Sequence, residues 1–271
     1  MQLTNEWFKI REIMPDIYLI EENKQLLEVK MYLVVGSAKC LLIDTGIGVG
    51  DLKALISKVT DLPIVVVNTH GHPDHVYGDA QFSTIHINSD DLFILEDCFV
   101  KENRRLVINN HQAEDFNLKI FLVEAWIDAV LNEVILIKDG DLFDLGNKII
   151  EVITIPGHSP GSVAFLARED RVLFSGDSVA GQIWMHLDHS MPLDTYLASL
   201  EKLGERIDEF DLILPAHAET PISSKIIAEF ILGIKGILQG EITGTPYQTP
   251  YGDGLIAEFP NCAVIYNENR L

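Results

Sequence analysis

The sequence predicts a single domain of mixed α and β structure over residues 1–271, composed of two similar halves stacked face to face. Each half has the same order of strands, hairpin, helix and strand. No linker or low-complexity segment divides the chain, and hydrophobic residues make up 47% of it, which is enough for a sizeable core. Layered domains of this length often form one unit.

The first half is predicted to be rich in strands. We expect strands at the apolar runs Ile17–Ile20, Val29–Val35, Cys40–Asp44 and Ile64–Val67, with a hairpin turn at residues 36–39. The last run is short and β-branched, which is typical of a buried strand. Leu52, Leu55, Ile56 and Val59 have helical spacing, so residues Asp51–Val59 are predicted to form a helix.

The second half repeats this order. We expect strands at Ile149–Ile155, Val163–Leu166, Arg171–Phe174 and Leu212–Leu214, and helices at Thr195–Glu209 and Ser224–Leu238. Asp194 is placed to cap the first of these helices. The tail from residue 239 ends in a strand-like run, Ala263–Tyr266. The middle, residues 90–133, is predicted to be mostly helical, to lie over the functional site and to influence substrate choice.

The composition limits the partners of the chain. Asp and Glu number 41 against 20 Lys and Arg, and the resulting charge of −21 repels phosphate backbones, so nucleic-acid binding is not expected. No signal peptide is visible, and the apolar stretch Ile226–Leu238 is too short to span a bilayer, so no membrane association is expected. Three distant cysteines without a CxxC motif favour the cytoplasm. The expected partner is a small-molecule substrate.

The strongest chemical signal is Thr-His-Gly-His-Pro-Asp-His at residues 69–75, directly after a predicted strand. His70 and His72 are two residues apart, which places both imidazoles on one side of an extended segment. Pro73 favours a chain that turns into a helix, with Asp74 and His75 near its start. This loop is therefore predicted to supply ligands to two metal ions.

Three further residues stand in the same relation to strands. His158, Asp177 and His217 each follow a predicted strand in the second half. A single Asp after a strand is more often a turn or cap residue. Together with the loop, however, four strand ends supply five His and two Asp, which favours a metal site.

The chain resembles the metallo-β-lactamase fold superfamily. HxHxDH at residues 70–75 is followed in order by GHSPGS, GD and PAH at residues 157–162, 176–177 and 215–217. The resemblance extends from about residue 17 to about residue 220, and HxHxDH is its most specific motif. It implies an α+β fold, a four-layer αββα sandwich with the metals at one edge between the sheets.

The same resemblance implies a ligand set. His70, His72 and His158 would bind the first metal, Asp74, His75 and His217 the second, and Asp177 would bridge the two. Asp44 matches the superfamily's buried aspartate that orients a ligating imidazole, a partner that metal-bound histidines generally need; a turn at a strand end is the alternative role. We assign Asp74 and Asp177 as catalytic residues as well.

This donor set suits hydrolysis. Imidazole and carboxylate favour two Zn²⁺ ions, while Mn²⁺ and Fe also accept them, and no cysteine is among the ligands to exclude iron. Two ions ~3.5–4 Å apart hold a hydroxide near neutral pKa, ready to attack a carbonyl or phosphoryl centre. Five neutral His, two Asp and a hydroxide leave such a site with about one positive charge, which attracts an oxyanion or a polarised carbonyl.

Several differences from known members of the superfamily narrow the range of expected substrates. Ala180 stands where lactone-cleaving relatives often have a tyrosine, and the tail lacks a recognisable glutathione-binding region. We therefore expect a cytoplasmic hydrolase of a small ester, lactone, thioester or phosphoester. The alternatives are a mononuclear iron redox enzyme of the dioxygenase kind and a metal-binding module without catalysis.

The other histidines have less certain roles. His186 and His189 either contact substrate or donate a proton to the leaving group, or they are polar loop residues. His86 is predicted to be a satisfied strand histidine. His111, in the middle segment, has no clear functional signal.

Overall fold

The computed structural model describes residues 2–4, 7–22, 29–110, 120–217 and 219–271. The chain divides into two compact units, Met1–Ile137 with Phe143–Lys148 and Lys138–Leu142 with Ile149–Leu271. These units correspond to the two halves expected from the sequence, and each contains its own sheet and helices. That both belong to one domain stays a prediction. Strand β9 (Leu142–Asp144) lies where the chain passes from one unit to the other.

The first unit contains an eight-stranded sheet in which spatial order follows chain order. Its strands are β1 (Gln2–Thr4), β2 (Phe8–Met14), β3 (Ile17–Glu22), β4 (Lys30–Val35), β5 (Cys40–Ile43), β6 (Ile64–Val67), β7 (Thr84–Asn88) and β8 (Glu133–Ile137). Strands β1 to β5 pair antiparallel, and β5 to β8 pair parallel. Parallel pairing requires long crossovers, and these crossovers contain the helices of this unit.

The helices of the first unit are short. They are α1 (Leu52–Ile56), α2 (Pro73–Val76), α3 (Leu92–Cys98), α4 (Lys101–Asn110) and α5 (Ile120–Ile127), with 3₁₀ turns η1 (Tyr77–Gln81) and η2 (Ser89–Asp91). Their buried side chains, such as Leu55 and Leu95, join Leu42 and Val66 of the sheet in one apolar core. Each fully buried Leu or Val contributes about 1.5–3 kcal/mol of transfer free energy.

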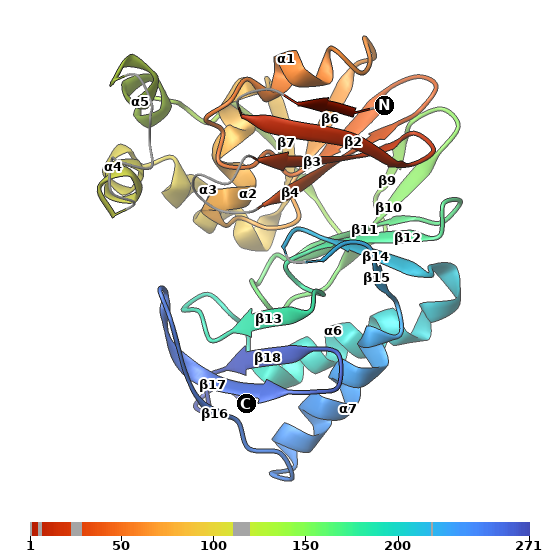
Figure 1. The fold of residues 1–271 in the computed structure, drawn as a ribbon, viewed down its shortest axis with the longest axis vertical. Helices are drawn as coiled ribbons and strands as arrows, with labels where there is room; N and C mark the ends of the chain where they lie inside the picture. Colours follow the sequence, from red (N-terminus) through yellow and green to blue (C-terminus); the bar gives the residue numbers. More distant parts are fainter. Residues whose placement is uncertain (1, 5–6, 23–28, 111–119, 218) are drawn as a thin grey trace. The chain divides into compact units, whose positions relative to one another are not determined.

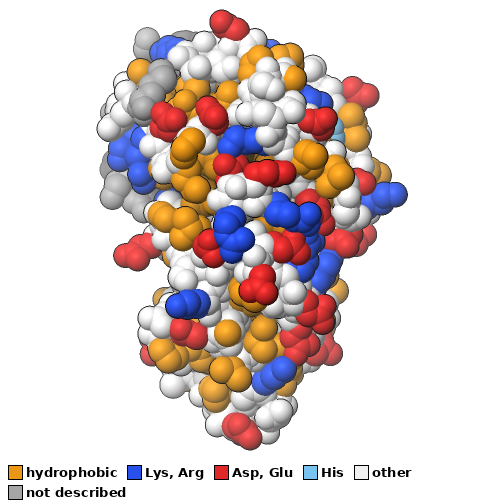
Figure 2. All heavy atoms as spheres, turned by 90° about the vertical axis from the view of Figure 1, so that its right-hand side faces the viewer, with side chains coloured by type: hydrophobic (Ala, Val, Ile, Leu, Met, Phe, Trp, Pro, Cys, Tyr) orange, Lys and Arg blue, Asp and Glu red, His pale blue; other side chains and the backbone are white. Residues whose placement is uncertain are grey.

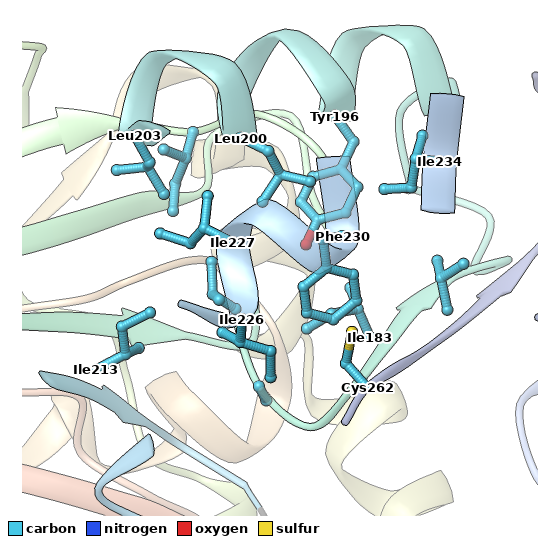
Figure 3. Packing of buried hydrophobic residues seen from close by; sticks show 14 of the residues in the cluster. Ile183, Tyr196, Leu200, Leu203, Ile213, Ile226, Ile227, Phe230, Ile234 and Cys262 are labelled. Carbon is cyan, nitrogen blue, oxygen red and sulfur yellow. The ribbon is translucent and has the colours of Figure 1, made fainter. Parts of the chain in front are cut away.

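The main sheet of the second unit contains β15 (Ile222–Ser223), β14 (Leu212–Pro215), β12 (Val172–Gly176), β11 (Val163–Ala167) and β10 (Ile149–Thr154), in this order. Helices α6 (Leu193–Glu205) and α7 (Ile226–Leu238) lie side by side, and η3 (Ile207–Glu209) follows α6 (Figure 1). Figure 3 shows Tyr196 and Leu200 of α6 packed with Ile227 and Phe230 of α7. This cluster is the core of the second unit.

A separate four-stranded sheet combines one strand that precedes α6 with three strands that follow α7. It contains β13 (Gln182–Met185), β18 (Ala263–Tyr266), β17 (Gly252–Glu258) and β16 (Thr245–Thr249), in this order. Strand β13 pairs parallel with β18, whereas β16, β17 and β18 pair antiparallel. The sequence predicted β18 with its bounds but not β13, β16 or β17.

One expectation on the helices needs correction. Helix α6 begins at Leu193 with Pro192 at its N-cap, so Asp194 lies in the first turn and is not the cap. Its carboxylate instead accepts a hydrogen bond from the neighbouring Thr195 backbone N–H. The middle segment is helical in α3, α4 and α5 as predicted, and strand β8, which pairs with β7, begins at its last residue. His111 lies outside the described residues.

Acidic and basic side chains lie next to one another on the face shown in Figure 2. In the second unit the Arg206 guanidinium contacts Glu151 and Glu209 at 2.8 and 2.9 Å, and Arg168 contacts the same two carboxylates. Arg168 is exposed, whereas Arg206 and both carboxylates are half-buried; an exposed ion pair contributes at most about 1 kcal/mol. Among the described helices, none is long and apolar enough to cross a membrane.

Candidate metal-binding site

The histidine loop of the first unit links the buried strand β6 to the short helix α2. His72 has extended backbone angles, φ −70° and ψ 152°, and Pro73 occupies the first helical position after it. Proline is preferred there because its missing N–H has no partner in a helix and its φ is already helical. The predicted turn into a helix at Pro73 is confirmed. Asp74 and His75 therefore lie in the first turn of α2.

The extended part of the loop brings two imidazoles together. Nε2 of His70 lies 3.0 Å from Nδ1 of His72, and the two rings meet edge to face. Two nitrogens that share a tetrahedral Zn²⁺ at about 2.0–2.1 Å lie roughly 3.3 Å apart. The separation of these two nitrogens is close to that value, so the pair is compatible with a common ion.

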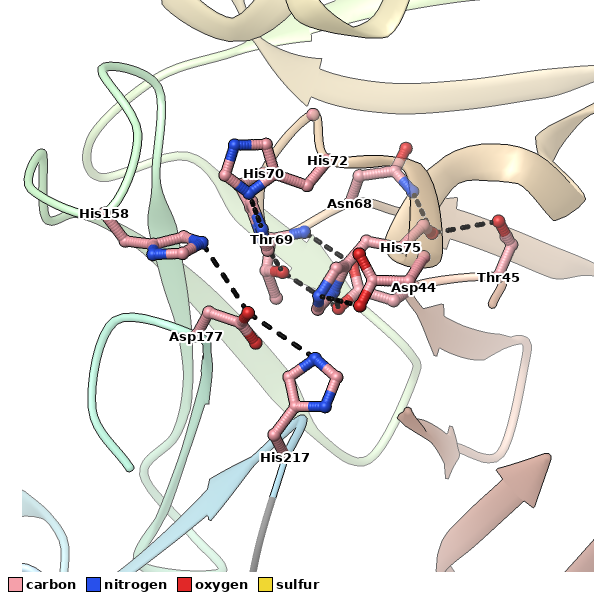
Figure 4. A network of polar contacts seen from close by, with 12 residues as sticks. Asp44, Thr45, Asn68, Thr69, His70, His72, His75, His158, Asp177 and His217 are labelled. Carbon is pink, nitrogen blue, oxygen red and sulfur yellow. Dashed lines mark hydrogen bonds and ion pairs between the residues drawn. The ribbon is translucent and has the colours of Figure 1, made fainter. Parts of the chain in front are cut away.

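Asp44 fixes the tautomer of His75. Its Oδ2 lies 2.8 Å from Nδ1 of His75, and both side chains are almost fully buried (Figure 4). A carboxylate only accepts hydrogen bonds, so Nδ1 of His75 must hold the proton. In the neutral ring Nε2 then has the lone pair that a metal requires.

The same carboxylate acts on His70 through Thr69. The Thr69 hydroxyl donates to Asp44 Oδ2 at 2.8 Å, and its backbone N–H donates to Asp44 Oδ1 at 2.7 Å. Having donated its only proton, the hydroxyl accepts from Nδ1 of His70 at 3.1 Å. Nε2 of His70, the atom that faces His72, therefore has the lone pair.

The second half of the loop places a carboxylate beside an imidazole. Oδ2 of Asp74 lies 3.7 Å from Nε2 of His75, and the rings of His75 and His70 are 4.0 Å apart between centroids. The first unit therefore groups all four predicted ligands of the loop: His70 with His72, and Asp74 with His75.

The second unit groups the other three predicted ligands. Oδ2 of Asp177 lies 3.6 Å from Nε2 of His158 and 3.5 Å from Nε2 of His217 (Figure 4). Strands β12 and β14 run parallel with Gly176 opposite Pro215, so the residues that follow them emerge side by side. Parallel register thus explains why Asp177 and His217, forty positions apart, meet.

The tautomer of His158 is also fixed. Its Nδ1 lies 2.8 Å from the carbonyl oxygen of Trp184, which can only accept, so Nε2 has the lone pair. His70, His75 and His158 thus all direct a basic Nε2 toward their neighbouring ligands. Imidazole lone pairs and carboxylates are the donors that divalent metal ions such as Zn²⁺ bind, and the residues present fit such ions.

Tyr196 supports two of these ligand segments, a role that the sequence does not reveal. Its hydroxyl donates to the carbonyl of Ser178 at 2.6 Å, next to Asp177. Its ring lies against Gly157, next to His158, where a Cβ would come within 2.5 Å of the ring. Helical spacing predicted Tyr196 only as a core residue.

Asp79 is a buried carboxyl group behind the histidine loop that sequence reasoning also missed. Its Oδ1 lies 2.8 Å from the Thr45 hydroxyl and 3.2 Å from the Asn68 amide. The amide also donates to the carbonyl of His75, and the Thr45 hydroxyl shares its single proton between that carbonyl and Asp79. Burial raises the pKa of Asp79 to about 8, which favours the neutral acid at pH 7. An isolated Asp in a turn resembles an ordinary capping residue, so no spacing signal could have identified it.

The remaining histidines lie elsewhere. His86 lies on β7 with Nδ1 2.8 Å from the carbonyl of Val66, as expected of a satisfied strand histidine. His186 is buried beside Thr249 of β16, with Nε2 3.0 Å from the hydroxyl, and burial lowers its pKa. His189 is exposed in the loop before α6.

Comparison with known proteins identifies the family. The sequence model of the metallo-beta-lactamase superfamily matches residues 26–217, and the chain belongs to this superfamily. Acyl-coenzyme A thioesterase MBLAC2 of Bos taurus is 26% identical over 236 residues, which cover 79% of this chain and 82% of the relative. The chain is therefore an enzyme of the metal-dependent hydrolase class, as the sequence predicted.

Solved structures agree on the fold. A metallo-beta-lactamase from Pontibacter korlensis superposes with a TM-score of 0.60 at 16% identity, covering 84% of this chain and 99% of that one. TTHA1623, solved in a di-iron-bound form, gives a TM-score of 0.58 at 24% identity, covering 78% and 97%. The predicted α+β fold class of the superfamily is confirmed.

Proposed function

We propose that the chain is a dinuclear metal hydrolase that cleaves small acyl thioesters. In this proposal one ion is bound by His70, His72 and His158, the other by Asp74, His75 and His217, and Asp177 is shared. Bound ions would supply a hydroxide nucleophile at neutral pH and polarise the acyl carbonyl. Zn²⁺ is the favoured ion, because five imidazoles and two carboxylates suit it, although Mn²⁺ and Fe accept the same donors.

The observation that supports two ions most directly is the environment of Asp177. One carboxylate oxygen lies about equally far from Nε2 of His158 and Nε2 of His217. These histidines belong to different ions in the proposal, and an oxygen that lies between them supports the idea of a ligand shared by two ions.

Two carboxylates have the catalytic roles in this proposal. Asp177 holds the two ligand groups at a fixed separation. Asp74, with Oδ2 beside His75, accepts a hydrogen bond from the attacking water and so orients its lone pair toward the acyl carbon. The leaving thiolate is a weak base and needs little help from a general acid.

The thioester class rests on the relative MBLAC2, whose name states that it acts on acyl-coenzyme A. The charge of −21 adds a condition, because coenzyme A is a polyanion that this acidic surface repels at long range. We therefore expect kcat/KM for acyl-coenzyme A to rise with ionic strength, as screening weakens that repulsion. A neutral thioester should not show this dependence.

The proposed enzyme does not act on nucleic acid, works in the cytoplasm and has iron as a second candidate metal. The acidic surface argues against a nucleic-acid substrate. All three cysteines, Cys40, Cys98 and Cys262, are free and buried, as is usual for proteins of a reducing compartment such as the cytoplasm. The di-iron form of TTHA1623 keeps iron as a second candidate metal, and with it the iron redox alternative.

The test combines metal analysis with a substrate panel. We expect about two zinc ions per chain and thiol release from acyl-coenzyme A or acyl-glutathione faster than hydrolysis of lactones or phosphodiesters. A thiol reagent is a suitable detector, because the chain's own thiols are buried. His72→Ala should lose metal and activity, whereas His189→Ala, a matched exposed histidine, should keep its metal. One iron per chain with no thioester cleavage would overturn the proposal in favour of redox chemistry.

A further inference from the structure

The histidine loop is held from behind by two buried carboxyl groups that lie outside its motif. Asp91, fully buried in η2, accepts a hydrogen bond from the backbone N–H of Gly71 at 2.8 Å. Gly71 is the residue between His70 and His72. Asp79, fully buried in η1, contacts Thr45 and Asn68, which both also contact the carbonyl of His75.

The position of Asp91 makes its contact with the loop informative. Asp91 is the N-cap residue of α3, where Asp is among the preferred caps because its carboxylate accepts backbone N–H groups. Its side chain makes no such capping bond and binds Gly71 instead. Helix α3 therefore lacks the side-chain cap that Asp91 could provide, and the Asp91 carboxylate instead fixes the backbone between two candidate ligands.

Residues at both ends of helix α3 contact the backbone of Gly71. At the C-terminal end, the Cys98 thiol donates to the carbonyl of Gly71 at 3.4 Å. A Cβ at Gly71 would lie 2.9 Å from the backbone oxygen of Asp91 and 3.0 Å from Cβ of Ile94. Only glycine fits this close approach, so the backbone between His70 and His72 has little freedom to move.

Asp79 acts on the other half of the loop. The carbonyl of His75 accepts from the Thr45 hydroxyl at 3.0 Å and from the Asn68 amide at 3.3 Å. Oδ1 of Asp79 contacts both of these side chains and so fixes their rotamers. Without Asp79, either side chain could turn away from His75, whose carbonyl would then keep the backbone N–H of Thr45 at 2.8 Å but lose a side-chain donor.

We propose that Asp91 and Asp79 are positioning residues for two different metal positions, Asp91 for the pair His70 and His72 and Asp79 for the pair Asp74 and His75. The inference rests on the proposed dinuclear function. Each carboxyl group fixes the backbone on which one pair is mounted, so each should control the affinity of one ion and leave the other nearly unchanged.

The experiment measures the two binding events separately. The full-length chain is stripped of metal and titrated with Zn²⁺ in competition with a chromophoric chelator. His72→Ala and Asp74→Ala identify which event belongs to which pair. Asp91→Leu and Asp79→Leu keep the approximate shape of the side chain but remove the acceptor, whereas Asp91→Asn and Asp79→Asn keep an acceptor oxygen.

Asp91→Leu is expected to weaken the event lost in His72→Ala by about 10–100-fold, the usual effect of removing an outer partner of a metal ligand. Asp79→Leu should weaken the event lost in Asp74→Ala to a similar degree. Each should leave the other event within about threefold of wild type, and the Asn variants should restore both events. Leu55→Ala, a core change in α1 outside the hydrogen-bond network of the loop, controls for general destabilisation.

Three outcomes would overturn the inference. The first is wild-type affinity at both events in the two Leu variants, and the second is equal weakening of both events in each, as in Leu55→Ala. The third, a wild-type chain that binds fewer than two zinc ions, would overturn the proposed function and this inference with it. Should the Leu variants fail to fold, Asp91→Ala and Asp79→Ala take their place in the same titration.

Discussion

Oδ2 of Asp44 lies 2.8 Å from Nδ1 of His75, and the same oxygen accepts the hydroxyl proton of Thr69. One buried carboxylate thus sets the tautomer of His75 directly and that of His70 through Thr69. Asp44 has a φ of +62°, in the left-handed region, where Asn and Asp are the side chains best tolerated after glycine.

Asp44→Asn is expected to weaken zinc binding by about 10–100-fold with little loss of folding. Asn tolerates the same φ, but its amide would donate where Oδ2 accepts, so His75 would have to accept at Nδ1 and hold its proton on Nε2. The measurement is a competitive Zn²⁺ titration together with a thermal melt. Wild-type affinity in this variant would show that the tautomer does not depend on Asp44.

Thr69→Val tests whether Asp44 orients His70 through the hydroxyl of Thr69. Valine has nearly the same shape as threonine but cannot accept from Nδ1 of His70, so the orientation of His70 is lost while the contact between Asp44 and His75 stays. We expect zinc affinity at one of the two binding events to fall about tenfold. Thr69→Ser keeps the hydroxyl and should bind like wild type; equal losses in both variants would mean that packing, not the hydroxyl, matters.

Two helical glycines offer an opposite pair of stability predictions. A Cβ at Gly233 in α7 would lie 2.3 Å from the Phe259 ring, whereas at Gly204 in α6 the nearest atom is 3.4 Å away. Alanine normally stabilises a helix interior by about 0.5–1 kcal/mol relative to glycine. Gly204→Ala should therefore raise the thermal midpoint, and Gly233→Ala should lower it.

The cost at Gly233 is expected to be about 1–3 kcal/mol, as for other overpacked cores. Replacing the opposing ring with the smaller side chain of Phe259→Leu in the Gly233→Ala background should recover part of the lost stability. A double-mutant cycle measured by urea denaturation would show this. A Gly233→Ala chain as stable as Gly204→Ala would contradict the close approach of α7 and Phe259.

Glu22 should make the metal-free protein less stable as pH rises. Burial raises the pKa of this carboxyl from 4.5 to about 7, helped by the nearby charge of Asp74, although hydrogen bonds from Ile47 and Gly48 oppose the shift. The folded state then binds a proton that the unfolded state has released. The stabilisation is complete below pH 4.5 and is lost as pH rises through about 7.

Glu22→Gln keeps an acceptor for the Ile47 N–H but does not titrate. Relative to wild type, its unfolding free energy should increase by about 1–3 kcal/mol between pH 4.5 and pH 8. Urea denaturation of chelator-treated protein at several pH values measures this difference. A constant difference across that range would show that Glu22 is ionised in the folded state at all of them.

Local signals predicted much of this fold. The β-branched run Ile64–Val67 is strand β6 with the bounds expected, and Pro73 begins α2 as its ring geometry requires. The prediction failed where partners distant in sequence decide the structure. Strand β8 forms because β7 pairs with it, and strands β16 and β17 form a hairpin rich in Gly and polar residues that lacks a regular apolar alternation.

The candidate site shows the same division. Seven ligand candidates are visible in the sequence because their side chains must be His or Asp and follow strand ends. Asp79, Asp91 and Tyr196, which hold the backbone behind them, are common residue types at unremarkable positions. Their roles depend on which backbone atoms they reach, and only tertiary structure determines that.

The backbone of Gly71 is held at its N–H by Asp91 and at its carbonyl by Cys98. These contacts limit how the histidine loop can be used in protein design. A designer who transplants residues 69–75 into another scaffold would transfer every ligand of the loop but neither end of α3. The grafted histidines would be ordered only when a metal binds, and the conformational entropy lost at that step would weaken binding. Weak and unselective metal binding is the expected result. The smallest portable unit is the loop together with α3, Asp44 and Asp79 with its partner Thr45.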